Sequence, residues 1–149
     1  MYTDARQYLK QYLQLKRMVA IKRRSRVMLI EVSQLSGVDF TKSRVQSTPK
    51  GDQIGDIVAR LEAMDREINS GIMRMLDTLE EIEQTINRIE SPIVREVLQR
   101  RYIFGERWEA IAEHMVYSQS QIFKIHRIGL VNIERLIDEN NKRDAAGAD

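Results

Sequence analysis

Residues 54–89 read IGDIVARLEAMDREINSGIMRMLDTLEEIEQTINRI, and apolar side chains recur through this stretch at steps of three or four. The recurring positions are 54, 57, 61, 64, 68, 72, 75, 79, 82, 86 and 89. This spacing places them on one face of an α-helix. At roughly 1.5 Å per residue the helix is a rod about 54 Å long. Because its apolar stripe is narrow, we expect a partner helix to cover it.

The expected partner precedes this helix, in residues 3–35. Its apolar residues keep helical spacing on both sides of a basic cluster, with Ala5, Tyr8, Tyr12, Leu15 and Val19 before it and Val27, Ile30 and Leu35 after it. Residues 1–90 are therefore predicted to form a long antiparallel helical hairpin of the coiled-coil type. Residues 36–52 connect the two helices. These 17 residues are long for a plain connection, so we expect the loop to have a role of its own.

The composition of the whole chain favours an all-α fold. Its 149 residues include only seven glycines and two prolines, and an all-β fold is excluded. The absence of cysteine removes disulfides, thiol nucleophiles and cysteine-ligated metal sites. The longest aliphatic run is VMLI at residues 27–30, far below the roughly 18 residues of a membrane span, and no signal peptide is recognisable. We expect a cytoplasmic protein with no membrane partner.

Cap signals divide residues 91–140 into a head of three short helices. Asp52 is the expected N-cap of the long helix, and Ser91 with Pro92 ends it, because the residue before proline avoids helical angles. Ser91 also caps the first head helix, which is expected to run to about Phe104 with Ile93, Val97, Leu98 and Tyr102 on one side. The second head helix is expected at residues 107–115 and the third from 119 to about 139. Residues 141–149 are expected to be a disordered tail.

The last two helices have the pattern of a helix-turn-helix. Ser118 and Gln121 fit a capping box after the break at residues 116–118, and small Ala112 allows close crossing. The expected core residues of this motif are Trp108, Ile111, Met115, Tyr117, Ile122 and Ile125. Because a helix fits the major groove, the polar residues at the start of the third helix are candidates for binding double-stranded DNA. These candidates are Ser118, Gln119, Ser120, Gln121, Lys124 and Arg127.

Charge is distributed unevenly along the chain. Residues 1–50 hold 11 basic and 3 acidic groups, residues 51–90 hold 4 and 10, and residues 91–149 hold 9 of each. The first two segments are complementary, so their charges are expected to pair across the hairpin. A second interpretation stays open beside this one: the cluster of Lys22, Arg23, Arg24 and Arg26 contacts phosphates.

Two stretches support a resemblance to known families. Residues 97–136, VLQRRYIFGERWEAIAEHMVYSQSQIFKIHRIGLVNIERL, resemble the DNA-binding region 4 of bacterial sigma factors. VQSTPKGDQIGDIV at residues 45–58, joined through a long helix to RRYIFGERWEAIAEHMVYS, resembles phage and prophage transcriptional regulators of the ArpU and RinA kind. The resemblance implies a phage-encoded activator of late genes that acts at a promoter with RNA polymerase in a bacterial host cell.

Some residues depart from the helix-turn-helix pattern. Val116 stands where many such proteins have glycine, so this turn must adopt another geometry or bear strain. Phe123 replaces a basic residue; packing on the hairpin is favoured over contact with a thymine methyl or with polymerase. Gly129 stands where a small core residue is expected. Lys124 and Arg127 are opposed by acidic residues, so useful DNA occupancy requires a second attachment, such as the basic cluster, polymerase or a homodimer formed through the hairpin.

The sequence lacks the parts of an enzyme. His114 and His126 lie on different predicted helices with no carboxylate at ligand spacing, so they are interpreted as a surface residue and a helix-face contact. No nucleotide-binding or hydrolase motif occurs, and no cofactor or metal is expected. The preferred hypothesis is a sequence-specific DNA-binding transcriptional regulator. Two alternatives stay open: a DNA-packaging protein like a small terminase, and a helical adaptor that binds no DNA.

Overall fold

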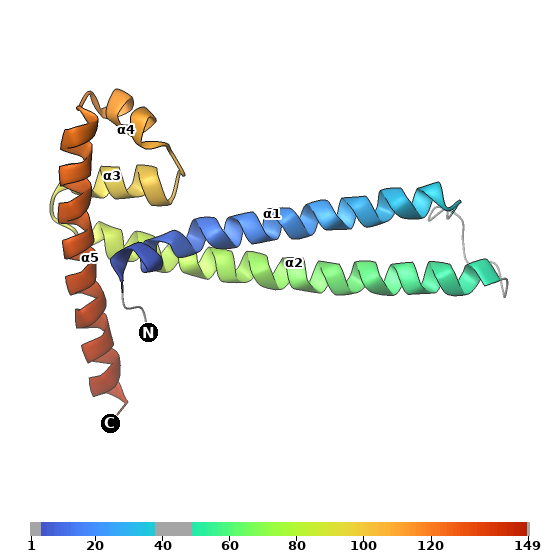
Figure 1. Ribbon diagram of the computed structural model, residues 1–149. Helices are drawn as coiled ribbons and strands as arrows, with labels where there is room; N and C mark the ends of the chain where they lie inside the picture. The colour runs from blue at the N-terminus through green and yellow to red at the C-terminus, as the bar shows by residue number, and fades with distance from the viewer. Residues whose placement is uncertain (1–3, 38–48, 149) are drawn as a thin grey trace. The chain divides into compact units, whose positions relative to one another are not determined.

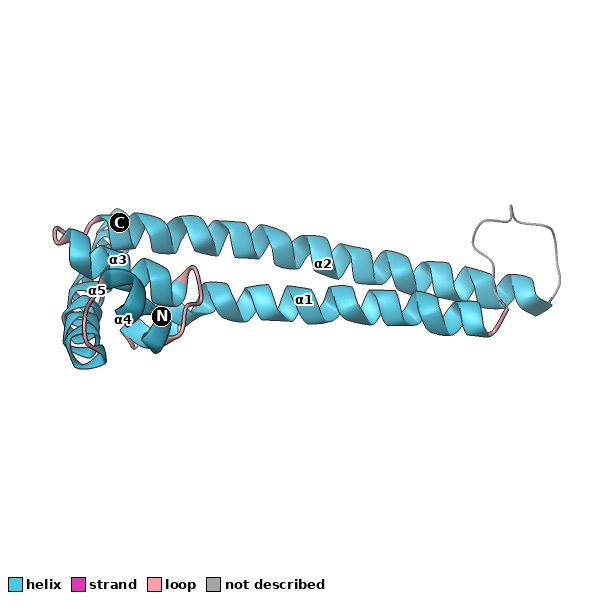
Figure 2. Cartoon of the chain, turned by 90° about the horizontal axis from the view of Figure 1, so that it is seen from above, coloured by secondary structure: helices cyan, strands magenta, loops and turns pink. Residues whose placement is uncertain are grey.

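The computed structural model describes residues 4–37 and 49–148, and the regular structure of these residues is helical (Figures 1 and 2). The helices are α1 (Ala5–Leu35), α2 (Pro49–Asn87), α3 (Pro92–Tyr102), α4 (Trp108–Met115) and α5 (Gln119–Gly147). The predicted all-α fold is therefore confirmed. The described residues form two compact units: residues 4–14 with 75–148, and residues 15–37 with 49–74.

In both units the segments of α1 and α2 pair in antiparallel order. Along α1, Tyr8 bonds to Thr85, Lys22 pairs with Glu67 and Arg26 pairs with Asp65, so partners on α2 move back along the chain. The predicted apolar stripe of α2 is buried or half-buried at every position. These pairs confirm the antiparallel hairpin.

The ends of α2 differ from the prediction. The helix begins at Pro49, so Asp52 lies inside its first turns and is not its N-cap. Proline favours this position because its fixed φ suits a first helical turn and the amide hydrogen that it lacks would be unsatisfied there. Most of the expected loop, residues 38–48, lies outside the described residues, and its predicted role stays a prediction. At the other end α2 stops at Asn87, before Ser91 and Pro92.

The packed face of α1 was predicted correctly only in part. Val19 is buried, but Val27 and Leu35 are 53% and 88% exposed. The helix instead continues its packed face through Lys22 and Arg26, which pair with acids of α2, and through buried Ser33. The hydroxyl of Ser33 donates to the Leu29 carbonyl at 2.6 Å, which satisfies it without a partner helix.

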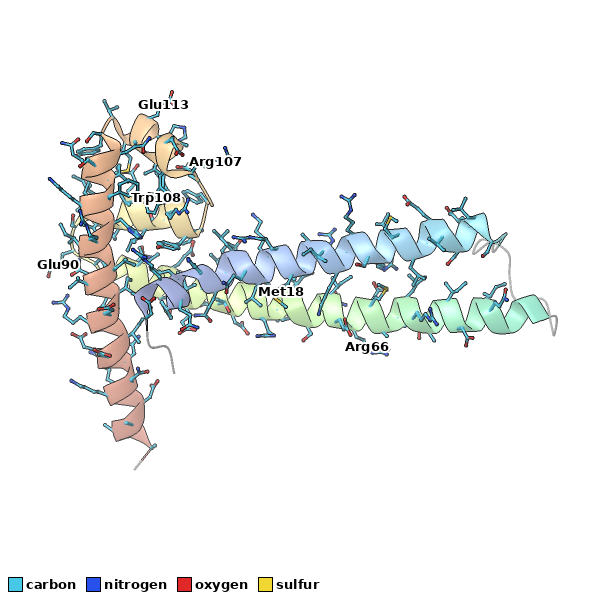
Figure 3. All side chains as sticks on the ribbon, in the orientation of Figure 1. Met18, Arg66, Glu90, Arg107, Trp108 and Glu113 are labelled. Atoms are coloured by element: carbon cyan, nitrogen blue, oxygen red, sulfur yellow. The ribbon has the colours of Figure 1, made fainter. Side chains whose placement is uncertain are left out.

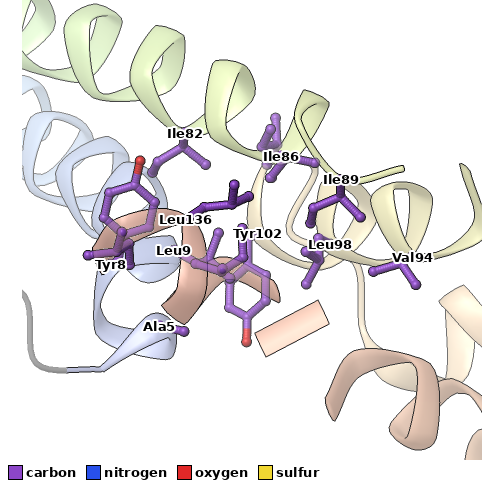
Figure 4. Close-up of a cluster of buried hydrophobic side chains, with 13 residues drawn as sticks. Ala5, Tyr8, Leu9, Ile82, Ile86, Ile89, Val94, Leu98, Tyr102 and Leu136 are labelled. Atoms are coloured by element: carbon purple, nitrogen blue, oxygen red, sulfur yellow. The ribbon is translucent and has the colours of Figure 1, made fainter. Parts of the chain in front are cut away.

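The larger unit is held together by one core that draws on four helices (Figure 4). Its buried residues are Ala5, Tyr8 and Leu9 of α1, Ile82 and Ile86 of α2, Ile89 between α2 and α3, Val94, Leu98 and Tyr102 of α3, Ile103 after α3, and Ile133, Leu136 and Ile137 of α5. The end of the hairpin therefore shares a core with the head, across the boundary expected at residue 90. The periodicity of α2 shows that its stripe is apolar, but it gave no signal of which helices cover it.

The predicted N-cap of α3 is confirmed, and one residue of its predicted buried side is wrong. Ser91 caps α3, and its hydroxyl accepts from the Val94 amide. Ile93, expected on the buried side, is 42% exposed, and Val94 is buried in its place.

Helix α5 is longer than the sequence indicated. It continues to Gly147, so the expected end near residue 139 and the disordered tail are wrong for the described residues. Buried Leu136 and Ile137 hold this part of the helix, and Arg88 donates to Glu139 at 2.9 Å and to Asn140 at 2.8 Å. The segment that follows includes four residues with high helix propensity, Lys142, Arg143, Ala145 and Ala146.

Candidate nucleic-acid interface

A three-residue turn connects α4 to α5. Val116 ends α4 with left-handed backbone angles, φ 59° and ψ 45°. Because a β-branched side chain disfavours these angles, the backbone of the turn is strained at Val116. The amide of Tyr117 donates to the Ala112 carbonyl at 3.0 Å and closes the helix end. Ser118 and Gln121 form the predicted capping box: each side chain accepts from the other's amide, at 3.2 and 3.0 Å.

The predicted core of this motif is confirmed residue by residue. Val97, Ile111, Ala112 and Ile122 are buried, and Trp108, Met115, Tyr117 and Ile125 are half-buried around them. Gly129 lies against α3, because a Cβ there would be 3.0 Å from Cδ2 of Leu98. Helix α5 is therefore fixed on one side by α3 and α4.

A cluster of aromatic rings lies directly under the candidate face of α5. Buried His126 shares a 2.7 Å hydrogen bond between its Nε2 and the Tyr102 hydroxyl. Trp108 contacts His126 edge-on at 4.7 Å and Phe123 at 5.2 Å between ring centroids (Figure 3 labels Trp108). The Arg101 guanidinium covers Trp108 at 4.5 Å. Phe123 thus packs on α4, and the packing on the hairpin that was favoured for it is wrong.

The histidine of this cluster is uncharged at neutral pH. Burial, reinforced by the cations Arg6 and Arg101, lowers the pKa of His126 to about 4. Burial also raises the pKa of the Tyr102 hydroxyl. Because both groups stay neutral, their hydrogen bond is satisfied without a buried charge. His126 is the helix-face contact that the sequence predicted.

All six predicted DNA-binding residues of the head are exposed. The Ser118 hydroxyl and the Gln121 Oε1 are bonded within the capping box, so these atoms cap the helix, and the predicted contact of both residues with DNA stays a prediction. No hydrogen bond or ion pair to another described residue involves the side chains of the remaining four, Gln119, Ser120, Lys124 and Arg127. Within the described residues no hydrogen bond or ion pair holds Lys124 or Arg127. The structure therefore brings together, on the solvent side of α5, a small set of side chains whose hydrogen-bond donors have no partner among the described residues.

The surface of α4 adds charges of both signs. Arg107 is exposed immediately before α4, has no capping hydrogen bond and was missed in the sequence (Figure 3). Its position directly before WEAIAEHM, at the entrance of the first motif helix, was the available signal. Glu109 and Glu113 are exposed on the same helix. His114 lies at the surface, as predicted. Its Nδ1 is 3.4 Å from Oε2 of Glu106.

The basic cluster of α1 divides into paired and unpaired residues. Arg26 donates to both carboxylate oxygens of Asp65, at 2.6 and 3.2 Å, and Lys22 lies 3.6 Å from Glu67. Arg23 and Arg24 are exposed and form no ion pair with any described residue. The pairing interpretation therefore holds for Lys22 and Arg26, while contact with phosphates stays a prediction for the other two.

No family model, curated protein or solved structure matches this chain. In the described part of the chain no group of three or more His, Asp or Glu residues is arranged to hold a metal ion. None of the described helices has the length and apolarity needed to cross a bilayer.

Proposed function

We propose that the chain is a sequence-specific DNA-binding transcriptional regulator that reads double-stranded DNA with the first turns of α5. One observation carries the proposal: Gln119, Ser120, Lys124 and Arg127 are exposed on a helix whose opposite side is clamped by buried Ile122, His126 and Gly129. A helix presented in this way fits the major groove. A rigid support is needed because hydrogen bonds to base edges require fixed geometry.

The proposed contacts follow from the chemistry of these side chains. Lys124 and Arg127 donate to guanine acceptors or to phosphates, and Gln119 pairs with adenine edges. Arg107, at the start of α4, contacts a backbone phosphate. Arg23 and Arg24 are further candidates for phosphates. The phage origin, the late promoter and the RNA polymerase partner rest on the family resemblance alone.

The central test removes the two cations of α5. Binding sites are first selected from a pool of random duplexes with the full chain, and affinities are then compared for a selected and a scrambled duplex. The variant Lys124→Ala with Arg127→Ala should lose at least tenfold of its preference, about 1.4 kcal/mol, while its helicity by circular dichroism stays unchanged. The control Lys142→Ala with Arg143→Ala removes the same charge from the exposed far end of α5 and should retain the preference.

Two results would overturn this assignment. If the double variant at positions 124 and 127 keeps its preference, α5 is not the reading helix. If no duplex is enriched at moderate salt, the chain does not read DNA, and the adaptor hypothesis replaces the proposal. A large ring in light scattering would favour the packaging protein.

A further inference from the structure

Helix α1 carries a second apolar stripe that does not face α2. Its large residues are Met18, Ile21, Met28, Val32 and Leu35, each about half exposed or more, and exposed Ser25 completes their spacing of alternating three and four. This is the a and d spacing of a coiled coil. The residues that pack on α2 follow stripe members by one position, at Val19, Lys22 and Arg26, so the stripe lies about 100° around the helix from α2.

Few side chains are fully buried in the unit formed by residues 15–37 and 49–74. Among its described residues only Val19, Ser33 and Ile68 are fully buried. The five large apolar side chains of the stripe therefore outnumber the apolar side chains that are fully buried among the described residues of this unit, Val19 and Ile68. Exposed apolar stripes of this kind usually mark an interface.

A groove opens beside the Met18 end of the stripe. Its walls are Leu15, Met18 and Val19 of α1 and Arg66 and Arg74 of α2, with Lys22, Glu67, Ser70 and Gly71 completing the lining (Figure 3 labels Met18 and Arg66). A Cβ on Gly71 would lie 2.9 Å from Val19, so this glycine lets the helices approach closely at the groove. The groove has a volume of about 280 Å³, which gives room for a protruding side chain.

We infer that this stripe is the interface of an antiparallel homodimer. Leu35, 88% exposed, lies at the opposite end of the stripe from the groove. A two-fold axis across the stripe places Leu35 of a second copy at the groove beside Met18, and the reverse contact forms at the other end. The same alignment sets Ile21 against Val32 of the second copy. The surface is therefore complementary to itself, as an isologous interface requires.

Charge selects the antiparallel orientation. Exposed Arg24 and Glu31 flank the stripe on the side away from α2. In the antiparallel alignment each Arg24 lies beside Glu31 of the other copy, which gives two attractive pairs. In a parallel alignment Arg17 would lie beside Lys22 of the other copy, and like charges would meet.

The inference does not depend on DNA binding, since the stripe and groove belong to α1 and α2. It does supply what the proposed function lacks. On a duplex whose two sites both heads can reach, binding of the first head raises the effective concentration of the second, which compensates for the few cations on each.

The oligomeric state of the full chain tests the interface. By light scattering the protein should have twice its 17.5 kDa mass. The variant Ile21→Glu with Val32→Glu should weaken dimerisation at least 100-fold, because it buries charges without partners. The control Val27→Glu changes a 53% exposed residue off the stripe and should stay dimeric. A monomeric native protein, a larger ring, or equal dissociation of the control would overturn the inference.

Cross-linking tests the orientation, because the chain has no cysteine of its own. Ile21→Cys and Val32→Cys chains should form a mixed disulfide when combined under mild oxidation. Neither should cross-link to itself, since equivalent positions lie about 17 Å apart along the antiparallel helices, far beyond disulfide reach. Self-cross-linking of each variant, without the mixed product, would overturn the antiparallel orientation. The selected-duplex assay on the Glu variant separates failure of the dimer from failure of DNA reading.

Discussion

The pair of Tyr102 and His126 shows how single residues set up the candidate interface. A histidine in the third turn of an outward-facing helix would ordinarily be exposed, yet His126 is buried against Trp108 and bonded to Tyr102. It anchors the turn of α5 between Lys124 and Arg127. The imidazole can do this only while neutral, because its surroundings include the cations Arg6 and Arg101.

Protonation of His126 should therefore destabilise the fold. Its pKa is about 4 in the folded chain and near 6.5 when unfolded, so the unfolded state binds the proton more readily between these values. The free energy of unfolding should fall by about 2 kcal/mol as pH drops from 6.5 to 4, with no such contribution above pH 7. Urea unfolding at pH 7, 5.5 and 4 measures this. His126→Gln cannot titrate and should show a flatter profile; equal slopes for both proteins would contradict the assignment.

Helix α5 depends on a close approach to α3. A Cβ at position 129 would lie 3.0–3.1 Å from the Leu98 side chain, which is fully buried. The first turns of α5 carry the proposed reading residues on their exposed side. The contact between α3 and the opposite side of α5 holds these turns in place.

Gly129→Ala should lower stability by about 1–2 kcal/mol, because overpacking outweighs the gain in helix propensity. Gly147→Ala provides a matched control on the same helix, since a Cβ there meets nothing within 4 Å. That variant should be neutral or slightly more stable. Thermal unfolding followed by circular dichroism distinguishes them. Equal stability of the two variants would show that the helices do not pack this closely in solution.

For the whole molecule, the basic cluster decides whether the hairpin contributes to DNA affinity. Lys22 and Arg26 are used in pairing with α2, and Arg24 is assigned to the dimer. Arg23 is exposed and is required by neither contact. It is therefore the cation that can test contact with phosphates without disturbing either interface.

Arg23→Glu should weaken binding to the selected and scrambled duplexes by the same factor, several-fold at 0.1 M salt, and reduce the salt dependence. Arg60→Glu makes the same charge change on an exposed residue of α2 and should have a smaller effect. Equal losses for the two variants would mean that only net charge matters. A changed preference between the duplexes would instead indicate base reading by α1.

Features that depend on near neighbours could be predicted from the sequence. The helical stripe of α2, the cap at Ser91, and the capping box of Ser118 and Gln121 each arise from residues a few positions apart. Local spacing and short-range hydrogen bonds determine them. The exposure of Lys124 and Arg127 follows from the same helical period.

Contacts between distant residues were decided only when the chain folded. The pairing of Arg26 with Asp65, the packing of Phe123 on Trp108 and the extension of α5 past residue 139 all depend on which surfaces meet. The shared core of the hairpin end and the head is of the same kind. Periodicity shows that a face is apolar, but the partner of that face is chosen by shape and charge in three dimensions.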